Sequence, residues 1–235
     1  VGRGSCILAP RAVVAHPLVD YVIVGEGEGA LPELCAALAT GSQLDHVANL
    51  GYHKSTATVI NPPRPFVALS TLPEIDWSLL EINNYVDRRR QEFDIGETSR
   101  GCPRHCTFCY NHAFHHHTWR ADSAERVVAR MFHFACHLSV SSLWLRDDNF
   151  FVDWARVAAI CDGLRHGGFR GTWHTSGMHV ATCDGLADEQ LRVLRASGFT
   201  AARFGVESGS PRLLRLLRKD FTVEQVLRVN KRCAA

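Results

Sequence analysis

The chain has 235 residues, of which 46% are hydrophobic and 21% are charged, and its formal net charge is +2 at pH 7. This composition is typical of a globular protein and excludes a disordered chain or a coiled coil. The 26 basic residues are scattered among 24 acidic ones, so no basic stripe predicts a nucleic-acid partner. No apolar run approaches the roughly 20 residues of a membrane span, and no apolar signal-peptide core opens the chain. We therefore expect a cytoplasmic protein without a membrane partner.

The first part of the chain, residues 1–45, is predicted to end in one strand followed by one helix. The β-branched and aromatic run at 19–24 predicts a buried strand. Residues 30–39 have apolar side chains at helical spacing, and Gly41 is the expected end of that helix. This part therefore predicts a single βα unit.

The second part, residues 46–91, has a different composition. It is rich in asparagine, glycine and proline, with short β-prone pieces such as residues 56–60. Such a composition favours a hairpin or an extended linker. We therefore expect a domain boundary within this part.

The third part, residues 92–235, alternates strands and helices four times with a period of about thirty residues. The predicted strands cover residues 93–98, 140–145, 171–175 and 200–206. The helices are expected to begin at an Asp122–Glu125 capping box, at Asp153, at Asp188, at Pro211 and near Thr222. This alternation predicts an α/β fold with parallel strands, either an open sheet or part of a (β/α) barrel, with its chemistry at the carboxyl ends of the strands.

Three of the nine cysteines, Cys102, Cys106 and Cys109, follow the first of these strands with the spacing CxxxCxxC. Thiolates are the usual ligands of iron–sulfur clusters, and three of them leave one iron of a four-iron cluster open. Two alternatives to an iron–sulfur cluster remain, namely a zinc site completed by a nearby histidine and a redox sensor. Zinc ligands usually come from two short knuckles, and no second CxxC exists. The other six cysteines are expected to be small buried hydrophobic residues.

The cysteine loop and later segments together resemble the radical SAM superfamily, in particular its branch with a cobalamin-binding domain. The loop has an aromatic residue, Phe108, before the third cysteine, and the TSRGCP sequence of residues 98–103 resembles the lead-in of that branch. Further resemblances cover residues 19–28 (VDYVIVGEGE), 73–77 (PEIDW), 145–150 (LRDDNF), 204–210 (FGVESGS) and 219–222 (KDFT).

The resemblance implies a partial (β/α) radical SAM barrel in residues 92–235, limited to its first four βα units. It also implies that residues 1–45 are the last βα unit of a Rossmann-like cobalamin-binding domain, so that the chain is a fragment. Ser5 stands where the branch often has a histidine, and we expect poor cobalamin binding by this chain alone. The alternatives are a non-catalytic zinc-binding or redox-sensing module, or an inactive truncated product.

The activity that the resemblance implies is reductive cleavage of S-adenosylmethionine by a four-iron, four-sulfur (4Fe–4S) cluster on Cys102, Cys106 and Cys109. The resulting 5′-deoxyadenosyl radical would serve methyl transfer, rearrangement or cyclisation of a small organic substrate. Cobalamin is a further implied cofactor, and a flavodoxin or ferredoxin is the implied electron donor. The implied S-adenosylmethionine contacts are Phe108, Asp147, Asp148, Asn149, Glu207, Ser208 and Gly209. An Asp-Asp-Asn run after a strand is also a common turn and helix cap.

Overall fold

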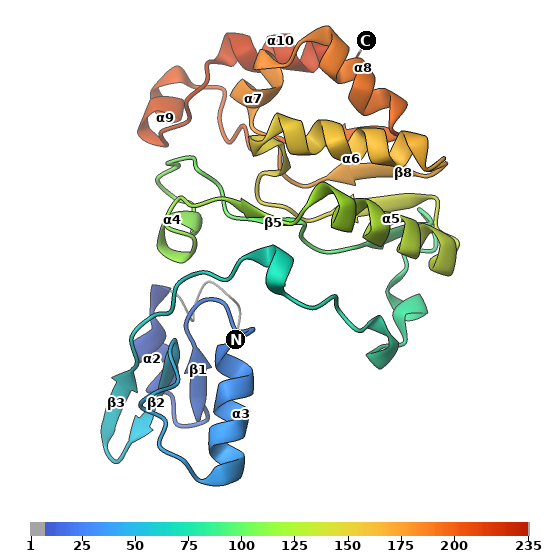
Figure 1. Ribbon diagram of the computed structural model, residues 1–235. Helices are drawn as coiled ribbons and strands as arrows, with labels where there is room; N and C mark the ends of the chain where they lie inside the picture. Colours follow the sequence, from blue (N-terminus) through green and yellow to red (C-terminus); the bar gives the residue numbers. More distant parts are fainter. Residues whose placement is uncertain (1–7, 235) are drawn as a thin grey trace. The chain divides into compact units, whose positions relative to one another are not determined.

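The computed structural model describes residues 8–234 and divides into two compact units (Figure 1). Unit 1 contains the chain up to Leu72 together with Tyr110–His116, and unit 2 contains Pro73–Cys109 and the chain from His117 onward. Ser5 lies outside the described residues.

Unit 1 is built on a three-stranded antiparallel sheet with the order β1-β2-β3. Its strands are β1 (Tyr21–Ile23), β2 (Leu50–Lys54) and β3 (Ala57–Ile60), and its helices are α2 (Pro10–Val14), α3 (Ala30–Thr40) and α4 (Asn111–Phe114). Helix α3 ends at Gly41, which takes the left-handed conformation (φ 66°) that glycine adopts without strain. Its buried face packs on Val47, Leu50 and Tyr52.

The β2–β3 hairpin is one of the two alternatives expected for residues 46–91. Its strand β2 pairs with β1, with Val22 opposite Gly51, so that residues 46–72 belong to the same compact unit as residues 8–45. They are therefore not a separate linker. A Cβ atom at Gly51 would lie 2.7 Å from the Cδ1 of Ile60, so a larger residue at this position would require the Ile60 side chain to shift.

Unit 2 is built on a four-stranded parallel sheet whose order, β4-β7-β8-β9, follows the chain (Figure 1). The strands are β4 (Glu92–Asp94), β7 (Ser142–Leu145), β8 (Thr172–Thr175) and β9 (Phe199–Ala202). A short antiparallel pair, β5 (Ser99–Arg100) with β6 (Arg120–Ala121), forms a separate two-stranded sheet. Parallel strands in sequential order, linked by helices, form the wall of a (β/α) barrel. The predicted α/β class and parallel sheet are confirmed.

The helices of unit 2 are α5 (Ala124–Leu138), α6 (Trp154–His166), α7 (Val180–Gly185), α8 (Asp188–Ala196), α9 (Pro211–Leu216) and α10 (Val223–Ala234), with 3₁₀ turns at Leu69–Thr71 in unit 1 and at Trp77–Leu79, Ile82–Tyr85 and Phe150–Val152 in unit 2. Asp153 caps α6 as expected, by accepting a bond from the Arg156 amide at 3.3 Å. The cap of α5 is Ser123 rather than Asp122, because its hydroxyl accepts from the Arg126 amide at 3.3 Å. Asp122 instead contacts Arg130 at 3.0 Å.

The core of unit 2 lies between this sheet and its helices, where Met131, Phe134, Ile160, Leu164 and Trp173 are fully buried. Burial of such side chains contributes about 1.5–3 kcal/mol each to the stability of this unit. No helix within residues 8–234 has the length and apolar character to cross a bilayer.

Candidate functional site

The three clustered cysteines lie on the loop that follows β5 in unit 2. Cys102, Cys106 and Cys109 are half-buried free thiols, and the amide of Cys109 donates to the carbonyl of Cys106 at 3.2 Å. Burial raises the pKa of Cys106, the charge of Lys219 lowers it, and the Cys109 and Cys102 thiols raise it further. The charges of Lys219 and of the other two clustered cysteines therefore act in opposite directions on the pKa of Cys106.

Their arrangement fits a cluster better than a single metal ion. Among residues 8–234, no group of three or more His, Cys, Asp or Glu side chains is placed to hold one ion. In a 4Fe–4S cluster each thiolate binds a different iron, so the sulfur atoms need not converge on one point. Three thiolates on one loop are therefore a donor set that fits this cluster.

Two other elements hold the cysteine loop in place. The end of α9 accepts from Thr107, whose amide donates to the Leu217 carbonyl at 3.1 Å. The end of β7 accepts from Gly101, whose amide lies 3.3 Å from the Asp148 carboxylate. Gly101 has a φ of 86°, which only glycine adopts without strain. The loop is thereby fixed at the carboxyl ends of the parallel strands.

Asp147 lies behind this loop, and its carboxyl group is buried. Its Oδ1 accepts from the Thr98 amide at 3.1 Å and from the Ser99 hydroxyl at 2.5 Å. Burial raises its pKa to about 6, although Ser99, Arg156 and Thr98 each pull the pKa down. Asp147 is only 1% exposed, so it orients the segment before the cysteines. Its other carboxylate oxygen, Oδ2, is buried and has no hydrogen-bond partner within the described chain, so the S-adenosylmethionine contact expected of Asp147 stays a prediction.

Asn149 lies beside the cysteines. Its side-chain amide donates to the Sγ of Cys102 at 3.4 Å, and its backbone carbonyl accepts from the Trp119 indole at 2.9 Å. Its side-chain oxygen is buried and has no hydrogen-bond partner within the described chain. A buried acceptor without a donor costs about 1–3 kcal/mol unless a ligand satisfies it. This oxygen is therefore suited to a donor on a bound cofactor.

The segment after β9 places Glu207 against a lysine that the sequence did not single out as a site residue. Lys219 donates from Nζ to the Gly205 carbonyl at 2.8 Å and lies 3.5 Å from the Glu207 carboxylate. Its side chain is 6% exposed, and its Nζ lies 5.2 Å from the ring centroid of Phe108. A buried lysine beside Cys106 supplies positive charge to the cysteine loop.

The remaining predicted residues of this segment are near the surface. Glu207 has a φ of 66°, and its side chain is 41% exposed. The Ser208 hydroxyl accepts from the Ser210 amide at 3.1 Å. A Cβ atom at Gly209 would meet nothing within 4 Å, so the space in front of this backbone is open in the described residues. Phe108 is 55% exposed.

A charged triad lies on the other side of Lys219. Asp220 accepts from Arg104, and the Arg104 guanidinium also donates to the Thr182 hydroxyl at 3.2 Å. The Nε2 of His179 lies 3.0 Å from Asp220 without hydrogen-bond geometry. Burial, and then the charge of Arg104, lowers the pKa of His179 to about 4. His179 is therefore neutral at pH 7, so the positive charge here comes from Arg104 and Lys219.

A comparison with protein families matches residues 97–235, which contain this site, to the Radical SAM superfamily. The chain belongs to the radical SAM superfamily. The same comparison supports the predicted use of an iron–sulfur cluster and S-adenosylmethionine, which are common to that superfamily.

Similar proteins align with most of this chain. An uncharacterized methyltransferase of Pyrococcus horikoshii is 29% identical over 210 residues, 89% of this chain and 45% of the relative. The anaerobic magnesium-protoporphyrin IX monomethyl ester cyclase of Rubrivivax gelatinosus is 25% identical over 231 residues, 95% of this chain and 41% of the relative. The chain thus spans less than half the length of these relatives.

A solved radical SAM structure has the same fold. The cobalamin-dependent S-adenosylmethionine radical enzyme OxsB, solved with aqua-cobalamin and S-adenosylmethionine, superimposes with a TM-score of 0.80 at 22% identity. The superposition covers 98% of this chain and 34% of OxsB. It confirms the predicted fold.

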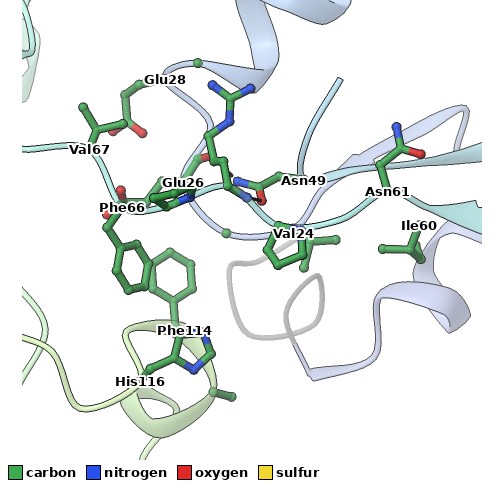
Figure 2. A pocket seen from close by; sticks show the side chains of 16 residues that line it. Val24, Glu26, Glu28, Asn49, Ile60, Asn61, Phe66, Val67, Phe114 and His116 are labelled. Atoms are coloured by element: carbon green, nitrogen blue, oxygen red, sulfur yellow. Dashed lines mark hydrogen bonds between the residues drawn. The ribbon is translucent and has the colours of Figure 1, made fainter. Parts of the chain in front are cut away.

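Unit 1 of this radical SAM chain contains a pocket of about 560 Å³ (Figure 2). Its lining includes the glycine-rich turn after β1, and Phe66, Phe114 and His116 line one wall (Figure 2). Asn49 orders the opposite side, because its side chain donates to the Glu26 carbonyl at 3.4 Å and accepts from the Arg64 amide at 2.8 Å. Sequence reasoning predicted the turn but not the pocket, since its walls come from four separate stretches of chain.

Proposed function

We propose that the chain is the cluster-bearing part of a radical SAM enzyme that performs methyl transfer or cyclisation on a small organic molecule. The observation that carries this proposal is the group of three free thiols beside Asn149, whose amide donates to Cys102 at 3.4 Å. Its named relatives are a methyltransferase and a cyclase.

When bound, the cluster supplies one electron to S-adenosylmethionine and cleaves its sulfonium to give a 5′-deoxyadenosyl radical. Cys102, Cys106 and Cys109 would hold three irons and leave the fourth open to S-adenosylmethionine. Lys219 offsets part of the negative charge that thiolates and sulfides bring to the loop. Asn149 donates to one of the ligating sulfurs.

S-adenosylmethionine would be held by groups at the carboxyl ends of β7 and β9. The partnerless side-chain oxygen of Asn149 and the carboxylate of Asp148 are acceptors for its ammonium group. Glu207 is an acceptor for the ammonium or for ribose hydroxyls, and the exposed ring of Phe108 is a surface for adenine. The open backbone at Gly209 allows close approach of the cofactor.

We assign unit 1 to a cobalamin-binding domain. This assignment is supported by the pocket beside the β1 turn and by the cobalamin in the solved OxsB structure. We place the reaction in the cytoplasm, where cysteine thiols stay reduced, with a flavodoxin or ferredoxin as the electron source. A spectroscopic cobalamin titration tests the assignment. We expect this chain to bind cobalamin weakly, because β1 and α3 form only one βα unit. Tight stoichiometric binding of cobalamin would contradict this expectation.

The first test is anaerobic iron and sulfide analysis of the reconstituted chain beside a Cys102→Ala, Cys106→Ala, Cys109→Ala triple variant. We expect about four irons and four sulfides in the parent and none in the variant. All five tryptophans lie in unit 2, so an unchanged fluorescence spectrum shows that the variant has kept this fold. The parent should then form 5′-deoxyadenosine from S-adenosylmethionine with dithionite as reductant.

Zinc in the parent, with no iron after reconstitution, overturns the proposal in favour of a metal-binding module. If the cluster loads but no 5′-deoxyadenosine forms, the cluster assignment stands and the radical chemistry is rejected for this chain.

A further inference from the structure

The cysteines outside the cluster loop are not all buried, although the sequence predicted that they would be. Cys161 and Cys183 are buried, whereas Cys35, Cys136 and Cys233 are exposed. Cys183 lies on the short helix α7, and Cys233 lies in the last turn of α10. These two cysteines are far apart in the sequence, but the contacts between their helices bring them together.

One face of α10 is bonded to α7 by three polar side chains. Gln225 donates to the Asp184 carboxylate at 2.9 Å, and Arg228 pairs with the same carboxylate at 2.7 Å. One turn later, Arg232 donates to the backbone carbonyls of Cys183 at 3.3 Å and of Asp184 at 3.1 Å. Residues spaced three and four apart share one face of a helix. Helix α10 is therefore fixed on α7 at the point where Cys183 lies.

The side chain of Cys233 interacts with Cys183 across this contact. Cys233 directly follows Arg232 and comes one turn after the buried Val229. Burial, the charge of Cys233 and a hydrogen bond with the Cys233 side chain together raise the pKa of Cys183 to about 12. Two thiols that share a hydrogen bond face each other, which is the arrangement from which a disulfide forms. Because only Cys233 is exposed, it is the thiol of this pair that a reagent in solution reaches first.

We propose that Cys183 and Cys233 are a modification site that closes to an intramolecular disulfide. The exposed Cys233 thiolate attacks a low-molecular-weight disulfide, such as oxidised glutathione, forms a mixed disulfide with it and releases one glutathione thiolate. The Cys183 thiol then loses its proton and displaces the second glutathione thiolate. The two protein thiols are thereby oxidised with the loss of two electrons and two protons, and one glutathione disulfide is reduced to two glutathione thiols.

The disulfide closes a loop of chain that contains α8, β9 and α9. The same loop carries Glu207 and Lys219, whose charged groups lie 3.5 Å apart at the candidate site. A cross-link removes conformational freedom from the unfolded chain, and it stabilises the folded state more when the closed loop is long. In a reducing compartment the two thiols stay free, and the disulfide forms only when small disulfides accumulate. Oxidation therefore stabilises the part of unit 2 that carries Lys219.

The test is anaerobic treatment of the purified chain with oxidised glutathione, followed by alkylation of free thiols and tryptic peptide mapping without reductant. Trypsin cuts after Arg170, Arg192 and Arg232, so the two cysteines fall in the peptides 171–192 and 233–235. We expect these two peptides as one cross-linked species that dithiothreitol separates. The midpoint of guanidinium unfolding, followed by tryptophan fluorescence, should rise by roughly 0.5 M in the oxidised chain.

Three single variants separate this disulfide from general thiol oxidation. Cys233→Ser changes an exposed side chain, and it should lack the cross-linked peptide and keep the same unfolding midpoint with and without oxidant. Cys136→Ser replaces another exposed cysteine, on α5, and as the matched control it should behave like the parent. In Cys183→Ser the reaction should stop at the mixed disulfide, so that Cys233 keeps one bound glutathione.

Two results overturn the proposal. The first is an oxidised chain in which Cys136 carries glutathione, so that the oxidant has acted, while Cys183 is still free for alkylation after unfolding. The second is a chain in which Cys233 is linked to other cysteines at least as often as to Cys183. An unfolding midpoint that rises equally in the parent and in Cys233→Ser overturns the stabilising effect assigned to this disulfide.

Discussion

The side-chain amide of Asn149 donates a hydrogen bond to the Sγ of Cys102 at 3.4 Å. This bond joins the end of β7 to the first of the three clustered cysteines. Hydrogen bonds to cluster sulfurs stabilise the reduced, more negative state and so raise the reduction potential. The potential of the bound cluster should therefore depend on this one amide.

Replacing Asn149 by alanine is expected to lower the reduction potential. Loss of a hydrogen bond of about 1 kcal/mol corresponds to a shift of about 40 mV for a one-electron couple. Iron content should stay at the parental level, because none of the three thiolate ligands changes. An anaerobic redox titration followed by electron paramagnetic resonance measures the shift.

The matched control for this variant is Gln225→Ala. Gln225 also uses a side-chain amide, which donates to Asp184 at 2.9 Å, but its partner is a carboxylate on α7. The reduction potential of the cluster in the Gln225→Ala variant should equal that in the parent. An Asn149→Ala cluster with the parental potential would show that the amide does not act on the cluster.

The alternation of strands and helices was enough to predict the sheet of unit 2, because each βα unit has its own local signals. Asp153 capping α6 is one of them, and glycines mark helix ends. The pairing of β1 with the 50–60 hairpin could not be predicted in this way. It depends on contacts between residues about thirty positions apart, such as Val22 with Gly51.

Within the site, the sequence predicted the three cysteines but did not separate Asp147 from Asp148 and Asn149. The alternation of buried and exposed side chains along β7 separates the two aspartates. Leu143, Leu145 and Asp147 are buried, whereas Asp148 is exposed. Extending the period of two beyond β7 would have placed Asp147 inside. Lys219 is more than one hundred residues from Cys106, and no local pattern connects them.

Glu207→Gln is expected to weaken S-adenosylmethionine binding about tenfold, because a hydrogen bond to a charged acceptor contributes about 1.5–3 kcal/mol. The carboxylate is 41% exposed and 3.5 Å from Lys219, so loss of that contact alone should change stability little. Equilibrium dialysis with the cluster-loaded chain measures the affinity. Glu224→Gln on α10 is the control. Equal affinities for S-adenosylmethionine in the two variants would mean that Glu207 contacts Lys219 and not the cofactor.

The stability of unit 2 should depend on pH through Asp147. Burial raises the pKa of this carboxyl from 3.8 to about 6, despite the facing charge of Arg156 and the hydrogen bonds from Ser99 and Thr98. Between these pH values the folded state holds a proton that the unfolded state has released. The contribution of the protonated Asp147 carboxyl to the free energy of unfolding is therefore complete below about pH 4, and it is lost as the pH rises to about 6.

Asp147→Asn removes this titration, because an amide does not ionise. The free energy of unfolding of the parent relative to the variant should fall by about 2–3 kcal/mol between pH 4 and pH 7. Guanidinium unfolding followed by tryptophan fluorescence reports this change for unit 2, which contains all five tryptophans. Asp162→Asn on the exposed face of α6 is the control and should show no such trend. A constant difference between the parent and Asp147→Asn across this range would mean that Asp147 stays ionised when buried. The Arg156 charge would then outweigh the loss of hydration at the base of the cysteine loop.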